Sequence, residues 1–342
     1  MLPTHGPLSD DLARAGVEVV VRPVSVLRRG LLRPAGLAGL AAGAARDAVA
    51  LRALIRARDV ALVHSNTSVV LGGAAGAASA RVPHVWHVRE IYSRFGRVWP
   101  PYRRLLQTAA ALPCVSAATA DQFPSDPRTR VIHDGLGVDA RRAPRAQARA
   151  ALGLPADVPA IAVLGRITDW KGQDVLIRAL AEPPLRDRGA LGLIAGEVWP
   201  GAEARRAGID GLARQLGVSD RLRFVGFRDD VETVYGAADL IAVPSTQPDP
   251  LPNSALEAAA AGCAVIAAAH GGLPDIIRDG ETGRLVAPGD GAALAAVAAE
   301  LLDDPDQRER LGAAARADVR ARFSAERLLG AIHALYDELL RS

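Results

Sequence analysis

The chain has 342 residues, of which 49% are hydrophobic and 23% are charged, and its formal net charge is +3. This length predicts about two folded domains, and the small net charge argues against a nucleic-acid partner. The longest uncharged run, residues 60–80, contains polar side chains and several glycines, so it is a poor membrane span. The N-terminus lacks the apolar core of a signal peptide. We therefore expect a cytoplasmic protein.

Two residue types stand out by their scarcity. Lys171 is the only lysine among 41 basic residues, and Asn66 and Asn253 are the only asparagines. A composition that favours Ala and Arg makes such residues slightly better candidates for chemical roles. Cys114 and Cys263 lie in apolar, strand-like runs, so we expect buried thiols rather than a disulfide or a metal site.

Strand and helix patterns alternate along the first half, which is typical of parallel α/β sheets. Residue 9 begins an expected helix that Gly16 closes, and residues 28–58 are helical with a break near Pro34. The expected strands cover residues 17–21, 60–64, 83–88, 112–116 and 130–133. Residues 139–159, rich in Arg, Ala and Pro, are the expected connection between domains.

The second half repeats this pattern. Its expected strands cover residues 160–164, 190–195, 222–226, 239–243 and 263–269. Its expected helices cover residues 172–180, 209–216, 255–261, 291–302, 305–323 and 325–340. Asn253 or Ser254 is the expected cap of the third of these helices. The sequence predicts two Rossmann-like domains that face each other across a cleft, with domain ranges 1–150 and 151–323 and a last helix, 324–342, that crosses back to the first domain.

The N-terminal sheet begins unusually. A parallel α/β domain normally opens with an apolar strand, a glycine loop and a helix, but here residues 1–3 resemble only the stub of a strand. We therefore expect the first strand-loop-helix unit to be missing.

Two charged groups follow the strand at 160–164. Arg166 and Lys171 lie between Gly165 and Gly172, and this spacing is not that of a Walker A loop. A guanidinium and an ammonium at a strand end could hold a diphosphate from two sides, although a solvated turn with two surface cations is an equally good interpretation.

Two carboxylates flank the next helix start. Asp249 and Glu257 lie eight residues apart, and the pair Gly271 and Gly272 opens the helix that follows. Helix N-termini after strand ends hold anions, and carboxylates accept hydrogen bonds from sugar hydroxyls. This combination favours a ligand with both phosphate and hydroxyl groups. The alternative is an ordinary loop aspartate and a surface glutamate.

In the first half, polar residues follow the expected strands at 60–64 and 83–88: Asn66, His87, Arg89 and Glu90. A lone strand histidine is more often a core residue than a catalytic one. Asp304 and Asp306 form a D-x-D pair without other nearby ligands, so we expect no metal site. Residues 92–104 mix aromatic residues with arginines and could meet an anionic membrane at its inner face, or form a solvated loop. The residues in question are Arg94, Arg97, Trp99, Arg103 and Arg104.

Together these motifs resemble the retaining glycosyltransferases of family 4, the "glycosyl transferases group 1" domain, which have the α/β GT-B fold. Segments GRITDWKGQDVLIRAL and RFVGFRDDVETVYGAADLIAVPS match the family pattern in order. So do DPLPNSALEAAAAGCAVIAAAHGGLPDIIRDGETGRLV and VIHDGLGVD. The resemblance covers the whole chain and is most specific in the second half.

The resemblance implies a role for each matching residue. Arg166 and Lys171 would hold the donor diphosphate in place of a metal, so neither metal nor cofactor is expected. Glu257 would bind the ribose and Asp249 the transferred sugar. The backbone at Gly226 and Phe227 would lie near the base, and that at Asn253, Ser254, Gly272 and Leu273 near phosphate and sugar. His87 or Arg89 would take the family's strand-end histidine position, with Asn66 and Glu90 on the acceptor side.

The chain departs from the family pattern at Asp249, one methylene shorter than the usual glutamate, and at Pro252, where glycine is frequent. The expected missing first unit normally carries a Gly-Gly loop. The resemblance implies a retaining, metal-independent transfer from a nucleotide-sugar to a hydroxyl of a glycan, a lipid-linked acceptor or a small molecule. The alternatives are a non-catalytic nucleotide-sugar-binding partner subunit and an epimerase of the same fold.

Overall fold

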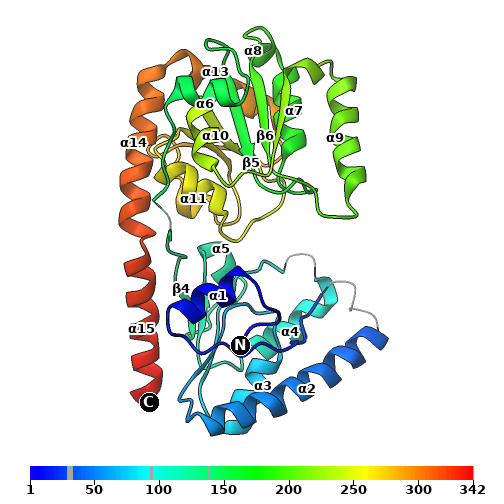
Figure 1. Ribbon diagram of the computed structural model, residues 1–342, viewed down its shortest axis with the longest axis vertical. Coiled ribbons are helices and arrows are strands. Elements are labelled where there is room, and N and C mark those ends of the chain that lie inside the picture. The colour runs from blue at the N-terminus through cyan, green and yellow to red at the C-terminus, as the bar shows by residue number, and fades with distance from the viewer. Residues whose placement is uncertain (29–33, 93–94, 138, 342) are drawn as a thin grey trace. The chain divides into compact units, whose positions relative to one another are not determined.

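The structure, a computed structural model, describes residues 1–28, 34–92, 95–137 and 139–341, and they form two compact units (Figure 1). The first unit contains residues 1–115 and 119–132 together with the chain from Ala331 onward. The second contains residues 116–118 and 133–330. Within the described ranges, no helix is both long and apolar enough to cross a membrane.

A six-stranded parallel sheet forms the centre of the second unit, with the order β10-β9-β8-β5-β6-β7. Strands β5, β6, β8 and β9 consist of Ala, Val, Leu and Ile, with one glycine in β6, and are buried along their whole length, as expected for strands covered on both faces. The strands are β5 (Ala160–Leu164), β6 (Leu191–Ala195), β7 (Leu222–Gly226), β8 (Leu240–Val243), β9 (Val265–Ala268) and β10 (Arg284–Val286).

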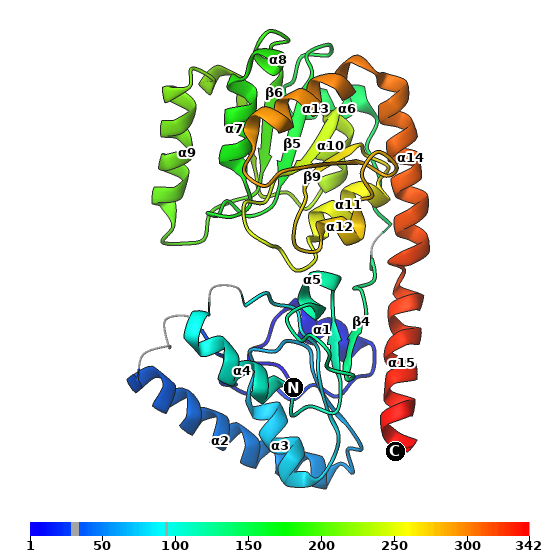
Figure 2. The ribbon, with the colours of Figure 1, turned by 180° about the vertical axis from the view of Figure 1, so that it is seen from behind.

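Helices cover both faces of this sheet (Figures 1 and 2). Helices α7, α8, α9 and α13 pack together over one face, and α6, α10 and α11 lie on the other. Helix α14 contacts both α11 and α13. The bounds are α6 (Arg145–Ala151), α7 (Gln173–Ala181), α8 (Pro183–Arg186), α9 (Glu203–Gln215), α10 (Val231–Ala237), α11 (Asn253–Ala260), α12 (Leu273–Ile276), α13 (Gly291–Asp303) and α14 (Pro305–Arg322), with a 3-10 turn at Ser219–Arg221.

The first unit has shorter strands. Two parallel pairs, β1 with β2 and β3 with β4, are joined by the single bridges Val85–Ala111 and Val88–Cys114. Its elements are α1 (Pro7–Arg14), α2 (Pro34–Ala57), β1 (Val63–Ser65), α3 (Gly72–Ala80), β2 (His84–Trp86), a 3-10 turn at Gly96–Val98, α4 (Trp99–Leu106), β3 (Leu112–Cys114), α5 (Ala117–Ala120), β4 (Thr129–Val131) and α15 (Ala325–Arg341). Helix α5 and helix α15 each contribute residues to both units.

The structure corrects several expectations. Residues 17–21 form no strand, because their only ladder contact is the parallel bridge between Leu2 and Val21. Residues 145–151 of the expected connection are helical. Pro252, rather than Asn253 or Ser254, is the N-cap of α11, and it has no side chain that could accept a hydrogen bond from the helix. Both cysteines are free and buried, as predicted.

Candidate functional site

The strand order places a ligand site at one edge of the second sheet. From β5 the chain moves to β6 on one side and later to β8 on the other, so the connections diverge between β5 and β8. In open parallel sheets, such a switch point leaves a crevice beyond the carboxyl ends of the two strands. The segments that follow these strands are residues 165–172 and 244–252, and they carry Arg166, Lys171 and Asp249.

Lys171 and Asp249 meet at this edge. The Lys171 Nζ donates a hydrogen bond to Asp249 Oδ2 at 2.7 Å, and the side chains are only 20% and 13% exposed. An ion pair this shielded from water is only weakly screened by salt. A Cβ added to Gly165 would lie 3.9 Å from Cδ and Cε of Lys171, so the stem of the lysine passes beside this glycine. The single lysine is therefore held at the switch point by a carboxylate from the segment that follows β8.

Close backbone contacts bring the loops at this edge together. A Cβ on Gly172 would lie 1.9 Å from the carbonyl oxygen of Pro244, and the φ of Gly172 is 76°. Only glycine is compatible with both the contact and this φ. Thr246 also donates its N–H to the Trp170 carbonyl at 2.8 Å. The positions of Lys171 and Asp249 thus depend on contacts between the two segments.

The Gly271–Gly272 pair packs against the backbone beside Asp249. The Gly272 N–H donates to the Asp249 carbonyl at 2.8 Å. A Cβ on Gly271 would lie 2.4 Å from that carbonyl oxygen, and one on Gly272 would lie 2.0 Å from the Pro250 carbonyl oxygen. Leu273, which opens α12, is fully buried. The glycine pair is therefore more than a turn, because it sets the conformation of the Asp249 loop.

Glu257 lies on α11, half-buried. The Tyr235 hydroxyl donates to its Oε2 at 3.3 Å. Burial raises the pKa of the Glu257 carboxyl above its ordinary value, and the Tyr235 hydrogen bond opposes that rise. Tyr235 is itself almost completely buried. Tyr235 lies in a segment that matches the family pattern, but its contact with Glu257 was not predicted, because the contact joins two separate helices, α10 and α11.

Arg166 takes a different position. Its guanidinium carbon lies 4.4 Å from the ring centroid of Trp199, which is 56% exposed, in a cation–π contact. Among the described residues, no hydrogen bond or ion pair joins Arg166 to Lys171 or Asp249. The Arg166 backbone is anchored, because the buried Gln173 donates its side-chain N–H to the Arg166 carbonyl at 3.0 Å. Neither Trp199 nor Gln173 was singled out from the sequence.

Three buried polar atoms in these segments have no hydrogen-bond partner within the described chain. They are the Thr168 hydroxyl, the Gln173 side-chain carbonyl oxygen and the Ser245 hydroxyl. Unpaired buried polar atoms are uncommon in native proteins and call for a water, an ion or a ligand. Thr168 and Ser245 lie in the segments that follow β5 and β8, and Gln173 opens α7 directly after the first of these segments.

The remaining donor-side candidates border the same edge. Gly226 ends β7 with φ 71°, and its carbonyl accepts the Gly196 N–H at 2.8 Å. Phe227 is 68% exposed. Asn253 is exposed at the start of α11, with Ser254 next to it.

In the first unit, Glu90 is the centre of a polar network. Its carboxylate accepts hydrogen bonds from the Thr67 and Ser68 hydroxyls and, at 3.2 Å each, from the backbone N–H groups of Ser68 and Arg89. Tyr92 donates its hydroxyl to the same carboxylate at 3.5 Å. With this many donors from its own unit, Glu90 supports the local structure, and its expected place on the side of the sugar acceptor stays a prediction.

His87 is buried among other histidines. Its side chain is 3% exposed, its Nε2 has no partner in the described chain, and its ring centroid lies 5.4 Å from that of His64. His64 Nδ1 shares a 2.5 Å hydrogen bond with the Tyr336 hydroxyl of α15. Burial lowers the pKa of His87 to about 3 and that of His64 to about 4, so both rings are neutral near pH 7.

Arg89 and Asn66 lie at the same end of these strands. Arg89 donates a long hydrogen bond of 3.5 Å to the Asn66 side-chain carbonyl, and Asn66 is exposed. Together with His87, they follow the carboxyl ends of β1 and β2. Which of His87 and Arg89 takes the family's histidine position stays a prediction, although His87 is the more buried.

The arginine-rich segment presents less aromatic surface than predicted. Trp99 stacks on Tyr92 at 4.9 Å and packs against the core of the first unit, whereas Arg97 and Arg104 are exposed. Arg103 is half-buried, and Arg94 lies outside the described residues. Across the described residues, no three His, Cys, Asp or Glu side chains come together in a group that could hold a metal ion.

Comparisons with known sequences place the chain among sugar transferases. The family model described as "Glycosyl transferases group 1" matches residues 144–318. The D-inositol 3-phosphate glycosyltransferase of Streptomyces scabiei is 38% identical over 229 residues, which cover 62% of this chain and 51% of that protein. Its counterpart from Mycolicibacterium paratuberculosis is 39% identical over 221 residues, covering 64% and 49%. The chain thus spans about half the length of the curated relatives it matches.

Comparisons with solved structures agree on the fold. Anabaena HepE in complex with UDP superposes with a TM-score of 0.82 at 24% identity, covering 98% of this chain and 92% of that one. The sucrose-phosphate synthase of Thermosynechococcus elongatus gives a TM-score of 0.77 at 27% identity, covering 95% and 85%. These likenesses confirm the predicted fold class, α/β of the GT-B type.

Proposed function

The chain belongs to the glycosyl transferases group 1 family, and we propose that it transfers a sugar from a nucleotide-sugar donor to an acceptor hydroxyl, with retention of the anomeric configuration. The observation that carries the proposal is the Lys171–Asp249 pair at the switch point of the second sheet. This pair puts a cation and a hydroxyl acceptor side by side where parallel sheets hold phosphorylated ligands. A nucleoside diphosphate sugar offers a partner for each group.

The proposed mechanism depends on stabilising the leaving group. As the bond between the sugar and the diphosphate breaks, negative charge develops on the departing phosphate oxygen. The Lys171 ammonium would donate to that oxygen, and the exposed Arg166 guanidinium would leave Trp199 to bind the diphosphate. Charges supplied by side chains would make a metal ion unnecessary. Asp249, released from Lys171, would then accept a hydroxyl of the transferred sugar.

The proposed donor is a nucleotide-sugar. Structures of HepE from Anabaena were solved with UDP and with UDP-glucose, and the curated relatives are named D-inositol 3-phosphate glycosyltransferases. We therefore propose that uridine diphosphate sugars be tested first as donors and small polyols or their phosphates first as acceptors, followed by glycans and lipid-linked acceptors.

The experiment is a thermal-shift screen against nucleotide-sugars, followed by product analysis of the hit. Proton NMR of the transferred sugar gives its anomeric configuration, and retention is expected. Turnover should persist after EDTA treatment. Inversion of the configuration, or activity that requires added Mg²⁺ or Mn²⁺, would contradict the mechanism. Donor binding without transfer or hydrolysis would favour a non-catalytic binding subunit instead.

A peripheral contact with an anionic membrane stays a prediction. Because Trp99 is packed inward, such a contact would depend on Arg97 and Arg104 and would be electrostatic. Co-sedimentation with anionic vesicles should then weaken steeply with salt and fall in the Arg97→Gln/Arg104→Gln variant. Equal binding to neutral vesicles would contradict it.

A further inference from the structure

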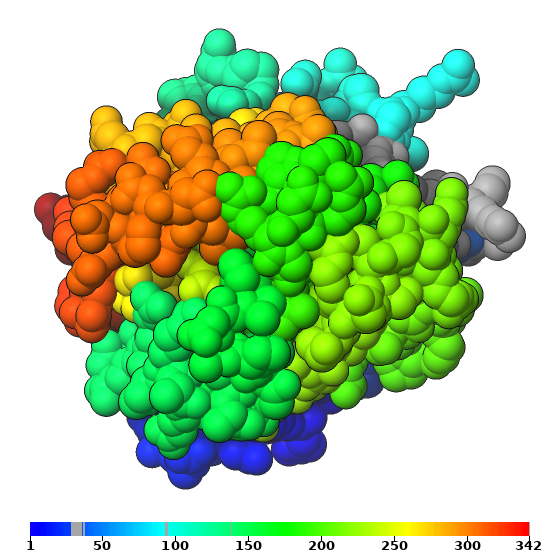
Figure 3. Space-filling model, turned by 90° about the horizontal axis from the view of Figure 1, so that it is seen from above, coloured from blue at the N-terminus to red at the C-terminus, as the bar shows by residue number. Residues whose placement is uncertain are grey.

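A deep hollow of the second unit lies away from the candidate donor site. It has a volume of about 1170 Å³ and is lined by Asp239 and Ala264, which immediately precede β8 and β9. It therefore lies at the amino ends of these parallel strands, whereas Lys171 and Asp249 follow carboxyl ends. Figure 3 shows the surface hollowed between α14 and the segment before α6.

Positive charge is concentrated in this cavity. Six arginines line it against only two acids, Asp239 and Glu309, so its excess of positive charge is larger than the net +3 of the whole chain. A hollow with walls of one sign focuses its field and attracts anions. The lining arginines are Arg141, Arg142, Arg145, Arg308, Arg316 and Arg320.

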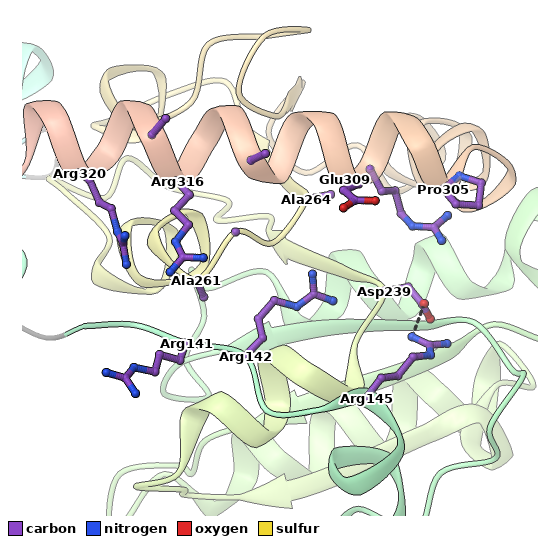
Figure 4. Close-up of a pocket in the computed structure, with 14 residues that line it drawn as sticks. Arg141, Arg142, Arg145, Asp239, Ala261, Ala264, Pro305, Glu309, Arg316 and Arg320 are labelled. Atoms are coloured by element: carbon purple, nitrogen blue, oxygen red, sulfur yellow. Dashed lines mark hydrogen bonds and ion pairs between the residues drawn. The ribbon is translucent and has the colours of Figure 1, made fainter.

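Four of the six arginines already have partners. Arg145 donates to Asp239 at 2.6 Å, as Figure 4 shows, and Arg308 donates to the Leu301 and Leu302 carbonyls at the end of α13. Arg141 and Arg320 both bind the carboxylate of Asp139, which lies just outside the cavity.

Arg142 and Arg316 are different. Within the described chain, neither side chain makes a hydrogen bond or an ion pair, and Arg316 interacts with Asp139 only at longer range. The two come from opposite walls, Arg316 from α14 and Arg142 from the segment before α6, and both extend into the space between these walls (Figure 4). Glu309 lines the same cavity but forms no ion pair with either arginine within the described chain, so both guanidinium groups can bind a shared anion.

Backbone contacts hold both walls in place. A Cβ on Gly312 of α14 would lie 2.2 Å from the Gly262 carbonyl oxygen, so α14 packs directly on the turn after α11 one helical turn before Arg316. On the other wall, the Ala143 N–H donates to the Glu232 carbonyl at 2.9 Å, and a Cβ on Gly236 would lie 2.3 Å from the Ala143 carbonyl oxygen. The backbone positions that carry Arg142 and Arg316 are therefore fixed, so binding would have to order only the two side chains.

We propose that this cavity binds a small, multiply charged anion of the phosphate or polyphosphate class, held between Arg142 and Arg316. The planar guanidinium fork matches the geometry of phosphate oxygens. The cavity is concave and its arginines lie on opposing walls, so a compact anion can reach both, whereas a flat bilayer surface would not. The site is separate from the proposed donor site and would exist whether or not the proposed reaction is correct.

The test uses inorganic tripolyphosphate as the probe, measured by isothermal titration calorimetry at constant ionic strength. All proteins carry Lys171→Ala, which weakens anion binding at the proposed donor site. The test variant adds Arg142→Gln and Arg316→Gln. The control adds Arg214→Gln and Arg310→Gln, which remove the same charge from two exposed arginines outside the cavity. Circular dichroism checks that every variant is folded.

We expect tripolyphosphate to bind the Lys171→Ala protein, and the Arg142/Arg316 variant to bind at least tenfold more weakly than the Arg214/Arg310 control. Three results would overturn the proposal: no binding to the Lys171→Ala protein, equal weakening in test and control variants, or no weakening in either. Equal weakening would show that the probe responds to net charge alone.

Discussion

The ammonium of Lys171 is 2.7 Å from Oδ2 of Asp249, although 78 residues separate them in the chain. A ligand that binds either side chain must therefore compete with the other side chain. A diphosphate that binds Lys171 must replace a carboxylate partner, and a sugar hydroxyl that binds Asp249 must replace an ammonium. In the free protein, the charge of each side chain is therefore balanced by the other. A ligand that carries both a phosphate and a hydroxyl could replace both partners at once.

Substitution of Asp249 should affect pyrophosphate binding and sugar transfer differently. In Asp249→Asn, Lys171 loses its ionic partner, so a free pyrophosphate should bind at least as tightly as before, while sugar transfer should fall about 100-fold or more because the amide is a poor acceptor for the sugar hydroxyl. Calorimetry with pyrophosphate and a turnover assay measure the two effects. A parallel loss of pyrophosphate binding would show that Asp249 mainly supports the loop.

Asp249→Glu restores the longer side chain that is usual in the family. The added methylene moves the carboxylate by about 1.5 Å, so we expect a change in the relative kcat/KM for sugars that differ in one hydroxyl. Competition between two donors measures this ratio directly. An unchanged ratio would exclude contact between this carboxylate and the transferred sugar.

Gly271 should tolerate alanine poorly for a steric reason. Gly271 and Gly280 have similar φ angles, 60° and 74°, but a Cβ at Gly271 would lie 2.4 Å from the Asp249 carbonyl oxygen, whereas one at Gly280 would meet nothing within 4 Å. Gly271→Ala should therefore destabilise the protein by about 1–3 kcal/mol more than Gly280→Ala. Thermal unfolding compares the two. Equal losses of stability in the two variants would mean that only the φ angle matters and that the contact with the Asp249 carbonyl does not.

Glu257 should make donor binding depend on pH. Burial raises the pKa of its carboxyl above the ordinary value of 4.5, and only the ionised form accepts two ribose hydroxyls. Donor affinity should rise with pH through a midpoint above 4.5, whereas the stability of the free protein should fall through the same window, because ionisation of this buried group costs more when folded.

The midpoint should respond to Tyr235, whose hydrogen bond lowers the pKa of Glu257. Tyr235→Phe should raise the midpoint, and Glu257→Gln should abolish the dependence. Calorimetric titrations with donor between pH 4 and pH 8 would show both. A midpoint that persists in Glu257→Gln would assign the dependence to another group.

The buried histidines predict a second pH effect, on stability. Burial lowers the pKa of His64 to about 4 and that of His87 to about 3, against an ordinary value of 6.5. Because the folded protein holds these rings neutral, each ring contributes its full share to the free energy of unfolding above pH 6.5. This contribution is lost as the pH falls toward 4, since protonation favours the unfolded chain. The melting temperature should therefore fall in this interval. His87→Asn should reduce the slope, and an unchanged slope would contradict the assignment.

Much of the second unit could be predicted because its central strands, β5, β6, β8 and β9, are almost entirely apolar runs. The ranges expected for β5, β8 and the helices from α13 to α15 agree with the structure to within a few residues. The prediction of a strand at residues 17–21 was wrong, because this segment forms only one bridge, between Val21 and Leu2, and no ladder. The N-cap at Pro252 was missed because side-chain capping was assumed where the helix begins without it.

The candidate site was predictable residue by residue but not as a set of contacts. Sequence position placed Lys171 and Asp249 at strand ends, but their pairing depends on the neighbouring positions of β5 and β8, which no local pattern specifies. For the same reason Tyr235 and Trp199 were not assigned as partners of Glu257 and Arg166. The arginine cavity joins the segments around Arg142 and Arg316, which no motif connects.

The central claim is that Lys171 holds the departing diphosphate at the switch point of the second sheet. The most direct measurement is release of nucleoside diphosphate from the donor found by screening, in the presence of EDTA, for wild type, Lys171→Ala and the exposed-arginine control Arg310→Gln. We predict turnover in the wild type and the control and a loss of at least 1000-fold in Lys171→Ala, about 4 kcal/mol of transition-state stabilisation. A Lys171→Ala rate within a few-fold of wild type would contradict it.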